Sequence, residues 1–118
     1  MTGEALVVAD EAGVIRLWNE VAVELFGHDT GAAVGSSLDL IVPEPFRERH
    51  WAGYRRAWTA GIADAHRVAL MPVLCADSEV RRFAGHLLPI KGPHGALAAI
   101  AGIYARPSDA DASLFAIA

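Results

Sequence analysis

The chain has 118 residues, of which 53 % are hydrophobic and 20 % charged, and its net charge is −4. A chain of this length can bury enough apolar surface for one core, so the composition excludes intrinsic disorder. The acidic balance argues against a non-specific nucleic-acid binder, and the apolar run 96–105 is too short for a membrane-spanning helix. Cys75 is the only cysteine, so no intrachain disulfide can form. We expect a cytoplasmic protein that binds neither nucleic acid nor membrane.

The N-terminal part predicts a β-hairpin followed by a helix. Two β-branched runs, 5–9 and 14–18, flank the turn signal Asp10-Glu11-Ala12-Gly13. Asn19 follows as a suitable N-cap, because its side chain can accept hydrogen bonds from the first free N–H groups of a helix. Gly27 is placed to end that helix.

The strongest helical pattern covers residues 46–60, after the stop and restart of Pro43-Glu44-Pro45. Its apolar stripe consists of four residues spaced four apart: Phe46, His50, Tyr54 and Trp58. Gly61 ends the pattern. A histidine within such a stripe is either a cofactor ligand or a polar edge residue of the helix, and both interpretations stay open at this point.

The remainder of the chain predicts three strands, at 66–74, 80–90 and 96–104. Pro72 and Pro89 fall inside these strands, and each must lie at a sheet edge or a bulge because proline has no N–H to donate. Two strands, then helices, then three strands is an α+β order, with helices over one face of an antiparallel sheet. We expect one domain at 1–107 and a C-terminal tail at 108–118.

Several segments of the first half carry a family resemblance: Ala5-Leu6-Val7-Val8-Ala9-Asp10, Trp18-Asn19, Leu25-Phe26-Gly27-His28 and Ile41-Val42-Pro43-Glu44-Pro45. In this order they resemble the PAS sensor family, over roughly residues 5–105. The resemblance implies a PAS fold, in which a five-stranded antiparallel sheet and a helical cover enclose a ligand pocket. It also implies a small-molecule ligand such as haem, flavin or an organic acid.

The segment 47–56 is similar to the long helix of the haem-containing PAS oxygen sensors. That resemblance implies haem b (iron protoporphyrin IX), with His50 as the proximal iron ligand and Arg56 on a propionate. It further implies a cofactor site that includes Tyr54, His66, Leu70, Met71 and Leu87. The alternatives are a solvent-facing strand edge for His66 and a plain core position for Met71. A flavin photosensor would need a reactive cysteine in a helical motif with Asn and Gln, whereas Cys75 lies in a strand region and the chain has no Gln.

The expected function is a haem-binding PAS sensor domain that binds a diatomic gas (CO, NO or O₂). It would signal through a partner protein or as a homodimer. The first alternative is a haem-free PAS module for dimerisation or for a small organic ligand, and the second is a haem enzyme acting on peroxide or nitrogen oxides. Because Leu70, Met71, Leu87 and Pro89 offer no strong hydrogen-bond donor, we expect CO and NO to bind well and O₂ to bind weakly or to oxidise the site quickly, unless an arginine moves in.

Overall fold

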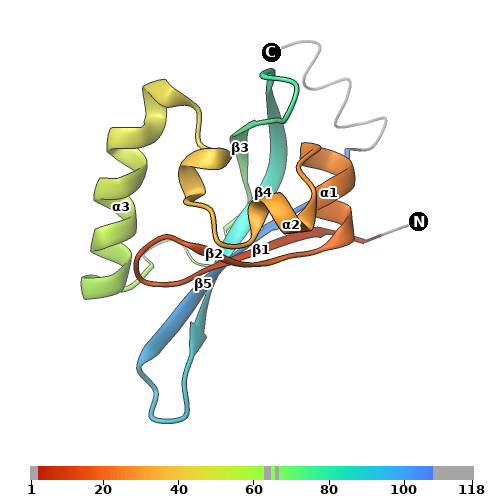
Figure 1. Cartoon of the computed structure of the whole chain (residues 1–118). Coiled ribbons are helices and arrows are strands. Elements are labelled where there is room, and N and C mark those ends of the chain that lie inside the picture. The colour runs from red at the N-terminus through yellow and green to blue at the C-terminus, as the bar shows by residue number, and fades with distance from the viewer. Residues whose placement is uncertain (1–2, 63–64, 66, 108–118) are drawn as a thin grey trace.

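The computed structural model describes residues 3–62, 65 and 67–107 of the chain. Five antiparallel strands form one sheet in the order β2-β1-β5-β4-β3, and the helices lie over one of its faces (Figure 1). In chain order the elements are β1 (Ala5–Ala9), β2 (Ile15–Trp18), α1 (Glu20–Phe26), α2 (Thr30–Ala33), the short 3₁₀ helices η1 (Leu38–Leu40) and η2 (Glu44–Phe46), α3 (Arg47–Ala60), β3 (Ala69–Leu74), β4 (Val80–Lys91) and β5 (Leu97–Tyr104). The predicted α+β class and its five-stranded antiparallel sheet are confirmed. The tail expected at 108–118 lies outside the described residues.

The β1–β2 hairpin and the start of α1 are joined by Asn19. Its side-chain Oδ1 accepts hydrogen bonds from the N–H of Ala22, at 2.9 Å, and from the N–H of Leu6, at 3.0 Å. Its Nδ2 donates to the carbonyl of Glu4 at 2.9 Å. One residue thus caps the helix, as predicted, and also fixes the helix to the neighbouring strand β1.

The main core lies between α1 and the covered face of the sheet. Trp18, at the end of β2, is buried and donates from Nε1 to the carbonyl of His28 at 2.9 Å. The ring of Phe26 contacts three others edge-on, with centroids 5.6 Å from Trp18, 5.2 Å from Phe83 and 5.1 Å from Tyr104. These edge-to-face contacts join α1 to β2, β4 and β5.

The two strand prolines occupy positions where no ladder donor is needed. Pro72 lies on β3, which is an edge strand of the sheet. Pro89 lies on β4 beyond Gly85, the last β4 residue that pairs with β3, and it is close to the register shift between Ile90 and Lys91. The edge-or-bulge prediction is therefore confirmed for both.

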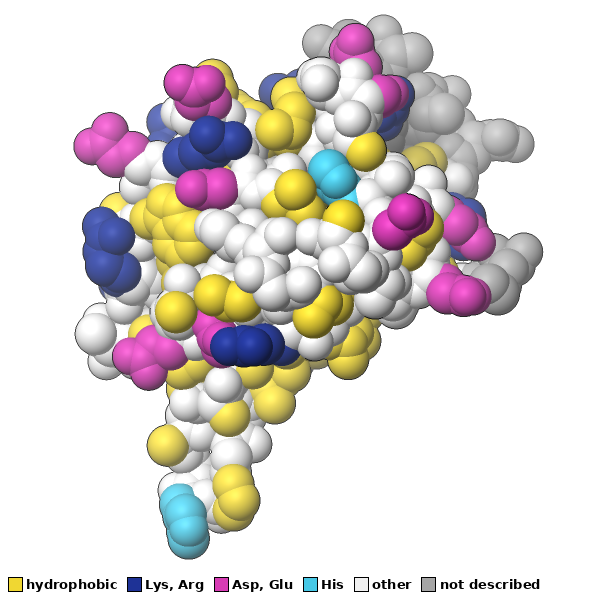
Figure 2. Space-filling model, viewed as in Figure 1, with side chains coloured by type: hydrophobic (Ala, Val, Ile, Leu, Met, Phe, Trp, Pro, Cys, Tyr) yellow, Lys and Arg dark blue, Asp and Glu magenta, His cyan; other side chains and the backbone are white. Residues whose placement is uncertain are grey.

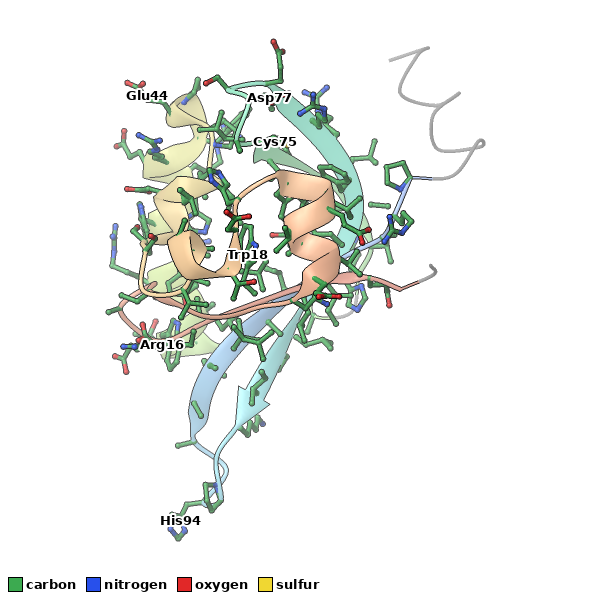
Figure 3. The ribbon with its side chains drawn as sticks, turned by 45° about the vertical axis from the view of Figure 1, so that its right-hand side comes forward. Arg16, Trp18, Glu44, Cys75, Asp77 and His94 are labelled. Carbon is green, nitrogen blue, oxygen red and sulfur yellow. The ribbon has the colours of Figure 1, made fainter. Side chains whose placement is uncertain are left out.

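Beyond the end of β3, the β4–β5 hairpin projects from the body of the molecule (Figure 1). His94 lies at its tip, and hydrophobic side chains are visible along it (Figures 2 and 3). The short helix α2 was not predicted, because four residues give no helical periodicity. Within the described part of the chain, no helix is long and apolar enough to cross a membrane.

Candidate functional site: a cavity between α3 and the sheet

A cavity of about 740 Å³ lies between α3 and the covered face of the sheet. Residues of α3 form one wall, and residues of β1, β4 and β5 form the wall opposite. β3 and the segment 38–43 complete the lining, which is mostly apolar. Pockets that hold small molecules and cofactors typically measure about 300–1,000 Å³. The fold therefore contains a preformed space of cofactor size.

His50 lies on the side of α3 that lines this cavity. Its ring stacks on Tyr54, with centroids 5.7 Å apart, and meets Trp51 edge-on at 4.8 Å. The His50 Nδ1 atom is buried and has no hydrogen-bond partner among the described residues. Burial lowers the pKa of His50, and the nearby Asp39 carboxylate only partly opposes this. The imidazole is thus held neutral at pH 7, the form in which histidine ligates a metal.

The two aromatic neighbours of His50 are themselves fixed to other parts of the fold. Trp51 donates from Nε1 to the Oδ1 of Asp39 at 2.8 Å, and its ring lies against Gly13 in the β1–β2 turn. The Tyr54 hydroxyl donates to the carbonyl oxygen of Asp10 in the same turn. Burial raises the pKa of Tyr54, so its hydroxyl keeps the proton that this hydrogen bond uses. The histidine is therefore held between two anchored rings rather than on a free helix face.

Six of the seven residues predicted for the cofactor site line this one cavity, and they come from three elements. The list is His50, Tyr54, Arg56, Leu70, Met71 and Leu87. Leu70 is 46 % exposed and Leu87 is 38 % exposed, so these two lie on the open side of the cavity. His66, the seventh, lies outside the described residues.

The sequence analysis missed two features of the α3 wall. Gly53 lines the cavity, and a Cβ atom built on it would meet nothing within 4 Å, so the helix presents bare backbone there. Arg49 also lines the cavity and, like Arg56, is exposed. Positions 49, 53 and 56 are spaced as one helix stripe, so the helical periodicity could have indicated that the two arginines flank the glycine.

On the opposite wall the sequence analysis missed Tyr104. This residue of β5 is buried, it lines the cavity, and burial raises its pKa to about 12. It shares a sheet face with Gly102 and Ile100, which also line the cavity. The alternation along β5 could have grouped these three residues, but the face they occupy depends on strand pairing that the sequence alone does not give.

Cys75 takes no part in the cavity. The residue directly follows β3, beside the turn that carries Asp77 (Figure 3), and it is buried. Its Sγ lies 3.9 Å from the carbonyl oxygen of Leu25 and 3.8 Å from that of Val73. Since it is the only cysteine of the chain, a cysteine–flavin bond inside the cavity is not available. Among the described residues, no group of three or more His, Cys, Asp or Glu side chains is arranged to hold a metal ion.

A sequence model of the PAS fold matches residues 2–111. The chain belongs to the PAS family. One similar protein is the sensor protein FixL of Bradyrhizobium diazoefficiens, which is 38 % identical over 47 residues. That segment is 40 % of this chain but only 9 % of the relative, so the chain corresponds to a small part of that sensor protein.

Two solved structures illustrate the same fold. The PAS domain of a protein from Colwellia psychrerythraea superposes with a TM-score of 0.75 at 20 % identity, covering 88 % of this chain and 86 % of that one. A LOV protein of Rhodobacter sphaeroides superposes with a TM-score of 0.71 at 18 % identity, covering 99 % of this chain and 66 % of that one. Likeness at these identities extends to the fold alone. Together with the family match, it establishes a PAS-fold domain that contains a cavity between α3 and the sheet.

Proposed function

We propose that this PAS domain binds haem b through His50 and senses a diatomic gas. The observation that carries the proposal is the neutral His50 imidazole on the cavity wall, without a hydrogen-bond partner among the described residues. A buried histidine in that condition has unmet capacity at its ring nitrogens. Similarity to the sensor protein FixL supports the proposal.

The residues of the cavity fit this group. Its volume of about 740 Å³ and its mostly apolar lining suit a large flat cofactor, and the bare backbone at Gly53 leaves room beside the helix. Arg49 and Arg56 are exposed at the cavity, where guanidinium groups can pair with the two propionates. His50 would hold the iron, and the haem would supply a coordination position for the gas.

The homodimer, the signalling partner protein and the domain limits 1–107 belong to the same proposal. A sensor must convert ligand binding into a change that a second molecule recognises, and this requires differential contacts between two conformations. The β4–β5 hairpin carries apolar side chains outside the cavity lining, with Ile90 40 % exposed and Leu88 half-buried. Those side chains offer contact surface to a second copy or to a partner.

The test is an absorption spectrum of the purified chain after reconstitution with haem. We expect a Soret band in the wild type and its loss in His50→Ala, with unchanged far-UV circular dichroism. His94→Ala is the matched control, because this histidine lies at the tip of the projecting hairpin, outside the cavity lining (Figure 3). A wild-type chain that takes up no haem would overturn the proposal. A His50→Ala variant that loads normally would remove His50 from it and leave another ligand to be found.

A further inference from the structure

The phenol of Tyr104 lies on the sheet wall of the cavity. Its ring is in edge contact with Phe26, with centroids 5.1 Å apart, and this fixes the side chain within the core. A Cβ atom built on Gly102 would lie 3.1 Å from the Tyr104 hydroxyl oxygen. The hydroxyl therefore lies over Gly102, a residue two positions back along β5 that also lines the cavity.

Tyr104 is only 8 % exposed, and its hydroxyl makes no hydrogen bond to any described residue. The hydroxyl oxygen is not one of the fully buried polar atoms without a partner, so it is accessible from the cavity that Tyr104 lines. Burial raises the pKa of Tyr104 to about 12, so the hydroxyl keeps its proton and can donate at any ordinary pH. The group is therefore a donor without an acceptor in the described part of the fold.

Among the described residues that line the cavity, Tyr54 and Tyr104 are the ones with hydroxyl groups, and Arg82 and His86 of β4 also carry N–H donors. The Tyr54 hydroxyl donates to the Asp10 carbonyl and is not free to serve a ligand. Tyr104 comes from the sheet, whereas His50 comes from the helix on the other side of the cavity. His50 and Tyr104 therefore belong to opposite walls of the cavity.

We propose that the Tyr104 hydroxyl would donate a hydrogen bond to the diatomic ligand of the proposed haem site, and that this would favour O₂ over CO. The inference rests on the proposed haem site. O₂ gains more than CO from such a donor because it develops more negative charge when it binds. Tyr104 is then a specificity-determining residue of the cavity, and the proposal predicts stronger O₂ binding than our sequence-based expectation did.

The test compares the haem-loaded wild type with Tyr104→Phe, which removes the hydroxyl and keeps the ring. Loss of a hydrogen bond to a charged acceptor predicts about 10- to 100-fold faster O₂ dissociation. CO dissociation should change less than about threefold, and the C–O stretching frequency should rise. Thr59→Val is the matched control, since it removes an exposed α3 hydroxyl that bonds only to the carbonyls of Arg55 and Arg56. It should leave all three quantities unchanged.

Folding of the variant is checked separately. Because the Tyr104 hydroxyl has no partner among the described residues, the melting temperature of ligand-free Tyr104→Phe should be no lower than that of the wild type. A measurement without any variant is the shift of the wild-type iron–O₂ vibration between H₂O and D₂O, which an exchangeable donor should produce. A loaded protein that shows no isotope shift, or unchanged O₂ dissociation in a folded Tyr104→Phe, overturns the inference and leaves the haem site standing. A wild type that takes up no haem overturns both.

Discussion

Replacing Gly13 by alanine tests the contact that holds the cavity helix against the β1–β2 turn. Gly13 has φ of +78°, a conformation that L-residues with a side chain rarely adopt. A Cβ atom at this position would lie 2.2 Å from Cη2 of Trp51, whereas ordinary contact begins at 3.4 Å. The substitution therefore strains the backbone and also forces the indole to move by about 1.2 Å.

The two effects can be given magnitudes. A side chain in the left-handed region costs about 1–2 kcal/mol, and overpacking a filled contact costs about 1–3 kcal/mol. We therefore expect Gly13→Ala to lower the free energy of unfolding by about 2–5 kcal/mol. For a domain near 100 residues, each kcal/mol lowers the melting temperature by about 4–8 °C, so the fall should be about 8 °C or more.

Urea and thermal denaturation measure the loss of stability. Substitutions at two other glycines separate the backbone cost from the overpacking cost. Gly95 has φ of +81° but open space around its Cβ position, so Gly95→Ala isolates the backbone cost of about 1–2 kcal/mol. Gly31 lies in α2 with open space and no positive φ, so Gly31→Ala should be neutral or stabilising by up to about 1 kcal/mol. If Gly13→Ala is no more destabilising than Gly95→Ala, Trp51 does not pack against the turn as described, and the reasoning fails.

Two further predictions concern pH and the tail. The pKa of His50 lies below its ordinary 6.5 in the folded state, so the unfolded chain binds that proton more readily. The contribution of His50 to the stability of the ligand-free protein should thus be complete well above pH 6.5 and decline as the pH falls below that value, and His50→Phe should flatten this decline. Asp10 and Asp77 also have lowered carboxyl pKa values, but they change protonation state at more acidic pH. An equal slope of stability against pH in the wild type and in His50→Phe would contradict the assignment to His50. The segment 113–118 lies outside the described residues, but its sequence is apolar, and apolar side chains stabilise a protein or a dimer when they leave water. Its deletion should therefore lower the melting temperature or the light-scattering mass, and no change in either would contradict this.

The features predictable from the sequence are those with local causes. Asn19 has the side chain that an N-cap requires, and Gly61 directly follows Ala60, the last residue of α3. The α3 pattern also placed His50 correctly on the cavity-facing side, since helical spacing determines a face without reference to the rest of the chain. The two strand prolines indicated a sheet edge or a bulge in the same way, because proline has no backbone N–H to donate to a neighbouring strand.

The features that the sequence did not reveal depend on contacts between distant elements. The pairing of Gly13 with Trp51 joins a turn to a helix 38 positions later, and no periodicity connects them. Tyr104 shares a face with the cavity floor only because β5 pairs with both β1 and β4. The sequence analysis missed Tyr104 for this reason. Alternation assigns the residues of a strand to two faces, but only the packing of the helices determines which face is buried.

These distant contacts also link the cavity to the hairpin turn. His50 lies between Trp51, which packs on Gly13, and Tyr54, which donates to the Asp10 carbonyl. Both contacts end in the same four-residue turn, so a displacement of the His50 ring must be absorbed at the turn or resisted by it. A packed contact resists continuous deformation and instead changes between discrete arrangements. Under the proposed function, the turn at residues 10–13 is therefore the part of the fold outside the cavity that a displacement of His50 would affect. Gly13→Ala should accordingly alter ligand affinity as well as stability.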